Sequence, residues 1–265
     1  MVIWLRLKGD KLLDKWLNIF LELQIKYFDK LQKTSVDGKT KIILIFNIIM
    51  MSTNSLATLV IMVPSLLDRD WLSLILDYLD GYCYALEHYI MLHHILLLSY
   101  INHCLSLLNN KLRYGPVKRS LVNNYFQLVK LLQEINDIYG PMIFNMFLGI
   151  LLTSSIYADS ILIYIKNGEY KLNLFEYFVQ VSALLLMWIN LYLYFLICDR
   201  VNETSRETTI IILEYSTRSN DNQEVELLFL EHLVLRLKIN ICGMFDLDLS
   251  SFFAFVAAIF LQLYY

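Results

Sequence analysis

Residues 177–198 read YFVQVSALLLMWINLYLYFLIC, a stretch without Asp, Glu, Lys or Arg. An apolar run of about 18 or more residues is typical of a helix that crosses a membrane. Four further windows of the 265-residue chain lack the same four residue types: 42–67, 88–110, 138–158 and 249–265. These windows predict an all-α, polytopic membrane protein with about five transmembrane helices, near 42–64, 82–104, 141–165, 175–198 and 247–265.

The composition narrows the class of protein. Hydrophobic residues make up 57% of the chain and charged residues 18%, whereas soluble domains carry about 45–50% apolar and about 25% charged residues. The formal net charge of −3 argues against the basic surface that nucleic acids require. The four cysteines have no CxxC spacing, so neither a zinc site nor a disulfide framework is indicated. These features argue against a soluble enzyme, a disordered chain, a secreted disulfide scaffold and a nucleic-acid-binding protein.

The segments between the apolar windows include amphipathic helices. Within residues 1–41, apolar side chains recur every three or four positions, which predicts one amphipathic helix that lies outside the membrane. Residues 42–265 then form the transmembrane helical domain. The same spacing predicts helices over 120–139 and 224–239, and Gly140-Pro141 marks the predicted start of the third span.

The orientation follows from the basic residues. Of the 22 Lys and Arg residues, 19 fall in 1–41, 101–140 and 198–240, and three fall in 65–76 and 166–173. Because loops rich in Lys and Arg stay in the cytoplasm, the N-terminus is predicted to be cytoplasmic and the C-terminus extracellular. The sequon that begins at Asn202 then lies on the cytoplasmic side, where glycosylation does not occur.

Polar residues inside the predicted spans are candidates for binding, because ionisable groups at membrane depth usually face a bundle interior or a cavity. Glu87, Asp159, Glu176 and Gln180 fall in the outer half of their spans, and His88 continues the polar face of its span. One interpretation is a polar, tyrosine-lined cavity that binds a small ligand from outside. The other is that these carboxylates mark the outer headgroup boundary and the tyrosines form an interfacial belt. The residues themselves leave both interpretations open.

Other chemistries have weaker support. A metal site would need His88, His93 and His94 on one face, but adjacent side chains diverge by about 100° on a helix. The sequence contains no GxGxxG, P-loop, GxSxG or HExxH motif, and these motifs mark common enzyme sites. We therefore expect no catalytic residues, no bound metal and no cofactor.

Two local motifs and the order of elements point to a family. The motifs are NDIYGP at 136–141, where a predicted cytoplasmic helix joins a span, and CGMFDLD at 242–248, before the last apolar run. With long cytoplasmic helices, very short outer loops and a last span that ends outside, the chain resembles the insect gustatory receptor family. The motif at 242–248 is the more specific of the two.

The resemblance implies a function and an assembly. Members of that family are ligand-gated cation channels of the plasma membrane, in which homo- or heterotetramers bind a small-molecule tastant and contact membrane lipid. The ligand would bind near Glu87, His88, Asp159, Glu176 and Gln180. In the family the last span of each subunit lines the pore, and a ring of its apolar side chains could gate by dewetting. The candidates for that ring, which could equally face lipid, are Phe252, Phe255, Val256, Ile259 and Phe260.

The chain departs from the family in two ways. Its five spans match the family's third to seventh, and the closing signature, Thr-Tyr, five apolar residues and Gln-Phe, is not intact. The resemblance therefore predicts a receptor truncated at both ends. The alternatives are a small polytopic transporter or accessory membrane protein that is complete as given, or a receptor fragment without activity.

Overall fold

The computed structural model describes residues 18, 38, 41–50, 52–53, 71–114, 119–167, 174–218, 239–241 and 245–264. Within the first predicted span, residues 42–50 and 52–53 are helical. The amphipathic helices predicted over 1–41 and 224–239 lie outside the described residues, apart from positions 18, 38, 41 and 239.

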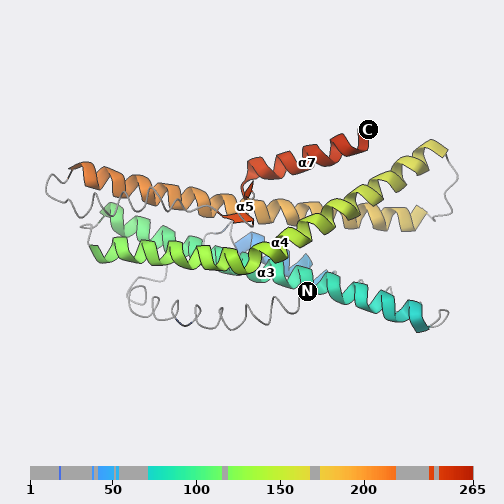
Figure 1. The fold of residues 1–265 in the computed structure, drawn as a ribbon, viewed down its shortest axis with the longest axis horizontal. Helices are drawn as coiled ribbons and strands as arrows, with labels where there is room; N and C mark the ends of the chain where they lie inside the picture. The colour runs from blue at the N-terminus through green and yellow to red at the C-terminus, as the bar shows by residue number, and fades with distance from the viewer. Residues whose placement is uncertain are drawn as a thin grey trace.

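Three long helices form the body of the molecule (Figure 1): α3 (Trp71–Tyr114), α4 (Arg119–Asn167) and α5 (Leu174–Arg218). Helices α3 and α5 run in the same direction and α4 runs in the opposite direction. At about 1.5 Å per residue each helix is roughly 65 to 75 Å long, about twice the thickness of a bilayer's hydrocarbon core. Each includes a segment that is long and apolar enough to cross a membrane: His88–Tyr114, Leu121–Ile156 and Leu184–Glu214.

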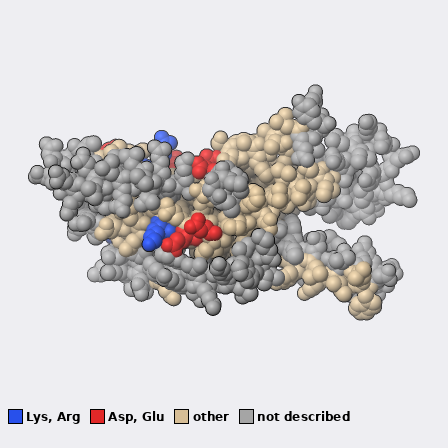
Figure 2. Space-filling view, in the orientation of Figure 1, with Lys and Arg blue, Asp and Glu red and all other residues tan. Residues whose placement is uncertain are grey.

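The basic residues gather at one end of the three-helix bundle. That end, called the polar end below, consists of 102–114 of α3, 119–137 of α4 and 199–218 of α5. Of the basic residues in these three helices, only Lys166 lies outside it. Figure 2 shows charged side chains at the left and middle of the visible face, whereas the described surface toward the right is tan. The residues predicted as cytoplasmic at 102–114, 119–137 and 199–218 are thus continuous with the apolar parts of the same three helices.

Helix α4 joins two elements that the sequence predicts as separate. Residues 120–139 and the span from 141 to 165 belong to one helix, with Pro141 inside it. A proline within a helix has no N–H for the bond to the residue four positions earlier, and its ring displaces that carbonyl, so it kinks the helix. Figure 1 shows α4 changing direction near its middle. The proline therefore bends the helix at the point where the sequence predicts a boundary between two elements.

A small antiparallel ladder leads into the last helix. Strands β1 (Asn240–Ile241) and β2 (Phe245–Asp246) pair with Asn240 opposite Asp246, and α7 (Leu249–Tyr264) follows. Helix α7 begins near the middle of the bundle and extends toward the end opposite the polar end (Figure 1). Apart from this ladder the described residues outside the turns are helical, which confirms the predicted all-α fold class.

The surface of α4 is apolar where a membrane would surround it. Leu148, Leu152 and Ile156 recur every fourth residue and are 47%, 54% and 65% exposed. Side chains four residues apart lie on one face of a helix. Because an apolar stripe this exposed costs free energy in water, we interpret it as a surface that faces lipid.

Candidate functional site

The three long helices meet at a cluster of histidine and tyrosine rings. His94 of α3 is completely buried, and its Nδ1 atom lies 2.8 Å from the hydroxyl oxygen of Tyr194 on α5. The same imidazole stacks on Tyr139 of α4, with ring centroids 4.9 Å apart and planes 17° apart. The neighbouring His93 forms a hydrogen bond through its Nδ1 atom with the hydroxyl of Tyr139. The cluster therefore links α3 to both of its neighbours.

The divergence of the two adjacent histidines explains this arrangement. Successive side chains on a helix point about 100° apart, so His94 reaches Tyr194 on α5 while His93 reaches the hydroxyl of Tyr139 on α4. The divergence of the two side chains argues against a metal ion shared by His93 and His94. The same divergence lets α3 form hydrogen bonds with both α4 and α5. Among the described residues, no three His, Cys, Asp or Glu side chains are grouped as metal ligands.

Helices α3 and α5 carry buried polar atoms without a hydrogen-bond partner. Within the described part of the chain, the Nε2 atom of His94, the Oδ1 atom of Asn190 and the hydroxyl oxygen of Ser99 are buried without a hydrogen-bond partner. Asn190 lies one helical turn before Tyr194 on α5. A buried polar group without a partner costs about 1–3 kcal/mol, so such atoms mark places where a water molecule or a ligand group would bind favourably. The middle of the bundle thus retains unused hydrogen-bonding capacity.

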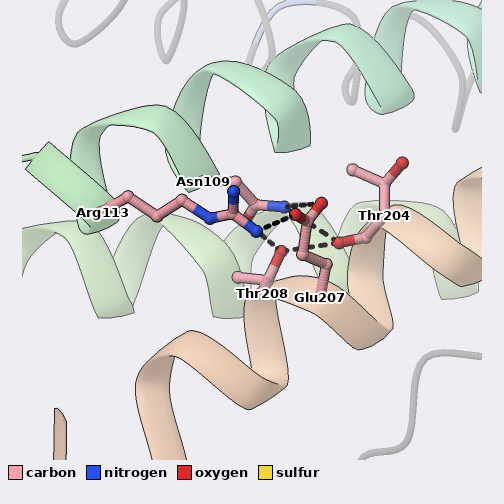
Figure 3. Close-up of polar contacts among 5 residues, drawn as sticks. All are labelled: Asn109, Arg113, Thr204, Glu207 and Thr208. Atoms are coloured by element: carbon pink, nitrogen blue, oxygen red, sulfur yellow. Dashed lines mark hydrogen bonds and ion pairs between the residues drawn. The ribbon is translucent and has the colours of Figure 1, made fainter. Parts of the chain in front are cut away.

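A second polar cluster joins α3 and α5 at the polar end (Figure 3). The Nδ2 atom of Asn109 donates to the carbonyl of Thr204 at 3.1 Å and to a carboxylate oxygen of Glu207 at 3.3 Å. Its Oδ1 atom accepts from the hydroxyl of Thr208 at 2.5 Å. Arg113 forms an ion pair with Glu207. Since Asn109 uses both ends of its amide, it fixes the register of α3 against α5.

Aromatic side chains attach α7 to the bundle. The ring of Phe252 lies 6.2 Å from Trp188 and 5.6 Å from Phe195, both on α5. One turn further, the ring of Phe255 lies 6.1 Å from Phe147 of α4 and 6.0 Å from Trp188. Helix α7 therefore packs on α4 and α5 together.

The side chain of Asn202 on α5 bonds the ladder before α7. The Oδ1 atom of Asn202 accepts from the backbone N–H of Ile239 at 3.2 Å, and its Nδ2 atom donates to the carbonyl of Leu247 at 3.1 Å. Asn136 of α4 donates to the Oδ1 atom of Asn240 at 3.3 Å. The two helices that pack on α7 therefore also hold the segment that precedes it.

The predicted ligand-binding residues lie on the three long helices, away from the polar end. Glu87 and His88 belong to α3, Asp159 to α4, and Glu176 and Gln180 to α5. His88 is partly buried, and the side chains of the other four lie outside the description. Their grouping into a pocket stays a prediction. Residue 87 precedes the buried His94 by two turns of α3, roughly 10 Å along the helix.

The predicted pore residues share one face of α7, and that face points into the subunit. Phe252 and Ile259 are 7% and 5% exposed, and Phe255 and Val256 are partly buried; the side chain of Phe260 is not described. The opposite face is open, with Phe253 61% and Leu261 60% exposed. Its other exposed members are Ala254, Ala257 and Ala258.

Sequence reasoning identified His93 and His94 but not their partners. Tyr194 and Asn190 lie four residues apart in a charge-free window. That spacing places two polar side chains on one face of a helix, and it is the signal in the sequence that points to them. The sequence marks Asn202 only as the start of a glycosylation sequon, whereas both polar atoms of its amide group bond the ladder. No sequence signal pairs a residue with a partner about one hundred positions away.

A model of the family described as 7tm chemosensory receptors matches residues 1–265 of the chain. No curated protein matches the chain.

Proposed function

The chain belongs to the 7tm chemosensory receptor family, and on that premise we propose that it is a gustatory receptor, a subunit of a ligand-gated cation channel that detects small-molecule tastants. The family is not a class of enzymes, and the long apolar helices make the chain a membrane protein. The proposal adds the taste modality, the channel activity and the plasma membrane as location.

The packing of α7 is the observation that carries this proposal. Phe252 and Phe255 of α7 contact Trp188 on α5 and Phe147 on α4. Helices α4 and α5 also carry Asp159, Glu176 and Gln180, which are proposed to contact ligand. A ligand that changes the position of these helices would therefore act directly on α7.

The proposed mechanism is a shift between two populations. The channel exists in closed and open states, and a tastant that binds the open state more tightly raises the open fraction. The shift is limited by the ratio of the two affinities. The histidine–tyrosine cluster lies where α3, α4 and α5 meet, so a change in the spacing of these helices would break or remake the His94–Tyr194 hydrogen bond.

Assembly into a homo- or heterotetramer is part of the proposal. We assign the open face of α7, with Phe253, Ala257 and Leu261, to contacts between subunits and to the pore. The face with Phe252, Phe255, Val256, Ile259 and Phe260 remains the alternative pore lining, which would require α7 to rotate. The reactivity of cysteines introduced on each face of α7 distinguishes these two pore linings.

Whole-cell recording tests the function. The full chain is expressed alone and together with a second receptor subunit, surface biotinylation verifies its delivery, and sugars, amino acids and alkaloids are applied. The expected result is a cation current evoked by at least one tastant class and absent from cells without the chain. A surface-delivered chain that gives no tastant-evoked current in either setting would refute the channel proposal.

A further inference from the structure

We propose that Asn202 is a positioning residue for gating, because its amide completes the backbone ladder before α7 and so makes α5 set the position of that helix. This inference rests on the proposed channel function and adds the residue through which α5 acts. Asn202 acts through hydrogen bonds to backbone atoms, and these bonds are separate from the aromatic packing of α7.

The amide of Asn202 takes the place of a backbone hydrogen bond. Ile239 and Leu247 form the next pair beyond Asn240 and Asp246 in the ladder, and the N–H of Leu247 donates to the carbonyl of Ile239 at 2.6 Å. A hydrogen-bonded antiparallel pair normally exchanges two such bonds. Here the second is replaced by Asn202, which accepts from the N–H of Ile239 and donates to the carbonyl of Leu247.

An amide is suited to this position because it carries a donor and an acceptor on one planar group. A carboxylate would keep only the acceptor, and an aliphatic side chain would leave both backbone groups without this partner. The two residues it joins are completely buried, at 0% exposed for both Ile239 and Leu247. The backbone groups at this position are therefore poorly placed to recover their hydrogen bonds from water.

The ladder and the first turn of α7 form one unit. The carboxylate of Asp248 accepts from the N–H of Ser251 at 2.7 Å, which caps the helix. The hydroxyl of Ser251 donates to the carbonyl of Asp246 at 2.6 Å. Because strand β2 is bonded to α7 in this way, a displacement of the ladder displaces the start of α7.

Helix α5 is continuous from Leu174 to Arg218, so the segment with Glu176 and Gln180 and the residue Asn202 share one helix. Helix α4 also reaches the ladder, where Asn136 donates to Asn240 at 3.3 Å. Asn202 makes two bonds, one on each side of the ladder. We therefore assign to α5 the link that bonds both sides of the ladder.

The test compares Asn202→Asp and Asn202→Ala with Asn102→Ala. Asn102 is the matched control, because its Oδ1 atom accepts from the hydroxyl of Thr204 at 2.7 Å and so joins α3 to α5 two positions along α5 from Asn202. Hydrogen–deuterium exchange of peptides covering 236–250 is measured on the full chain in nanodiscs. Ligand-evoked and ligand-free open probabilities are measured in cells, normalised to surface receptor.

Loss of one hydrogen bond changes an equilibrium by about fivefold. Asn202→Ala should speed exchange in 236–250 about fivefold or more and lower the ratio of ligand-evoked to ligand-free open probability by a similar factor. Asn202→Asp should do both, even if Asn202→Ala fails to reach the surface, because the aspartate fits the same space but faces the carbonyl of Leu247 with an oxygen. Asn102→Ala should leave both readouts near those of the unsubstituted chain.

Three results would overturn the inference: unchanged exchange in the Asn202 variants, an equal change in Asn102→Ala, or faster exchange with an unchanged ratio of open probabilities. The exchange measurement needs no ligand and no current. If the unsubstituted chain gives no tastant-evoked current while the Asn202 variants exchange faster, the channel proposal fails and the link to the ladder stands as structural only, which overturns the gating role.

Discussion

The hydroxyl oxygen of Tyr194 on α5 lies 2.8 Å from the Nδ1 atom of His94 on α3, and both side chains are completely buried. The bond joins two parallel helices at the level where α4 also contacts them through Tyr139. A polar bond in an apolar interior specifies one register of the helices, because a shift of either helix leaves polar groups without partners.

Tyr194→Phe should therefore lower the stability of the receptor. The substitution keeps the ring but removes the hydroxyl, which leaves both ring nitrogens of His94 without a hydrogen-bond partner among the described residues and costs about 1–3 kcal/mol. The thermal unfolding temperature in detergent should fall. Tyr192→Phe is the matched control, because Tyr192 is 37% exposed on the same helix; an equal decrease in that control would contradict this account.

Asn109→Ala should destabilise the bundle more than Arg113→Met. Asn109 is 4% exposed and bonds Thr204, Glu207 and Thr208, so its loss leaves buried groups unpaired at about 1–3 kcal/mol. Arg113 and Glu207 are 50% and 44% exposed at their side chains, and exposed ion pairs contribute about 0–1 kcal/mol. The measurement is the unfolding temperature of each variant, and the reverse order would show that the ion pair dominates.

Cysteine accessibility should identify the face of α7 that lines the pore. Ala257→Cys and Phe253→Cys should react with a charged, membrane-impermeant thiol reagent faster in the presence of an activating tastant and change the current. Ile259→Cys should not react, because Ile259 is 5% exposed within the subunit. Fast modification at 259 and none at 253 or 257 would favour the alternative pore face and require α7 to rotate.

Asp159→Ala should impair the tastant response more than surface delivery. A carboxylate in the outer half of a span is a candidate ligand contact, so its loss should raise the half-maximal tastant concentration about tenfold, as expected for a lost charged hydrogen bond. Dose–response curves and surface biotinylation are measured on the same cells. If delivery and response fall by the same factor, Asp159 supports folding and does not contact the ligand.

Several features of the fold could be predicted from the sequence. The window at 177–198 lies within α5, and the apolar run from 249 lies within α7. The break expected at Gly140-Pro141 is a bend within one helix. The difference arises because a proline removes one backbone bond, while packing on both sides of it keeps the flanking turns helical.

The candidate site was only partly predictable. The histidines of α3 stand out in an apolar window because they are polar. However, His94 links α3 to α5 only through Tyr194, which is one of 18 tyrosines in the chain. The role of Asn202 depends on two backbone groups, and backbone groups have no sequence signal at all.

The sequence by itself determined that this is a helical membrane protein and where its apolar segments lie, because hydrophobicity and charge are properties of each local stretch. The tertiary structure alone decided that His94 pairs with Tyr194, that Asn109 joins α3 to α5, and that Asn202 holds the ladder before α7. These bonds connect residues far apart in the chain, and they form only when the packing of the long helices places a donor and an acceptor together in a space that water does not reach.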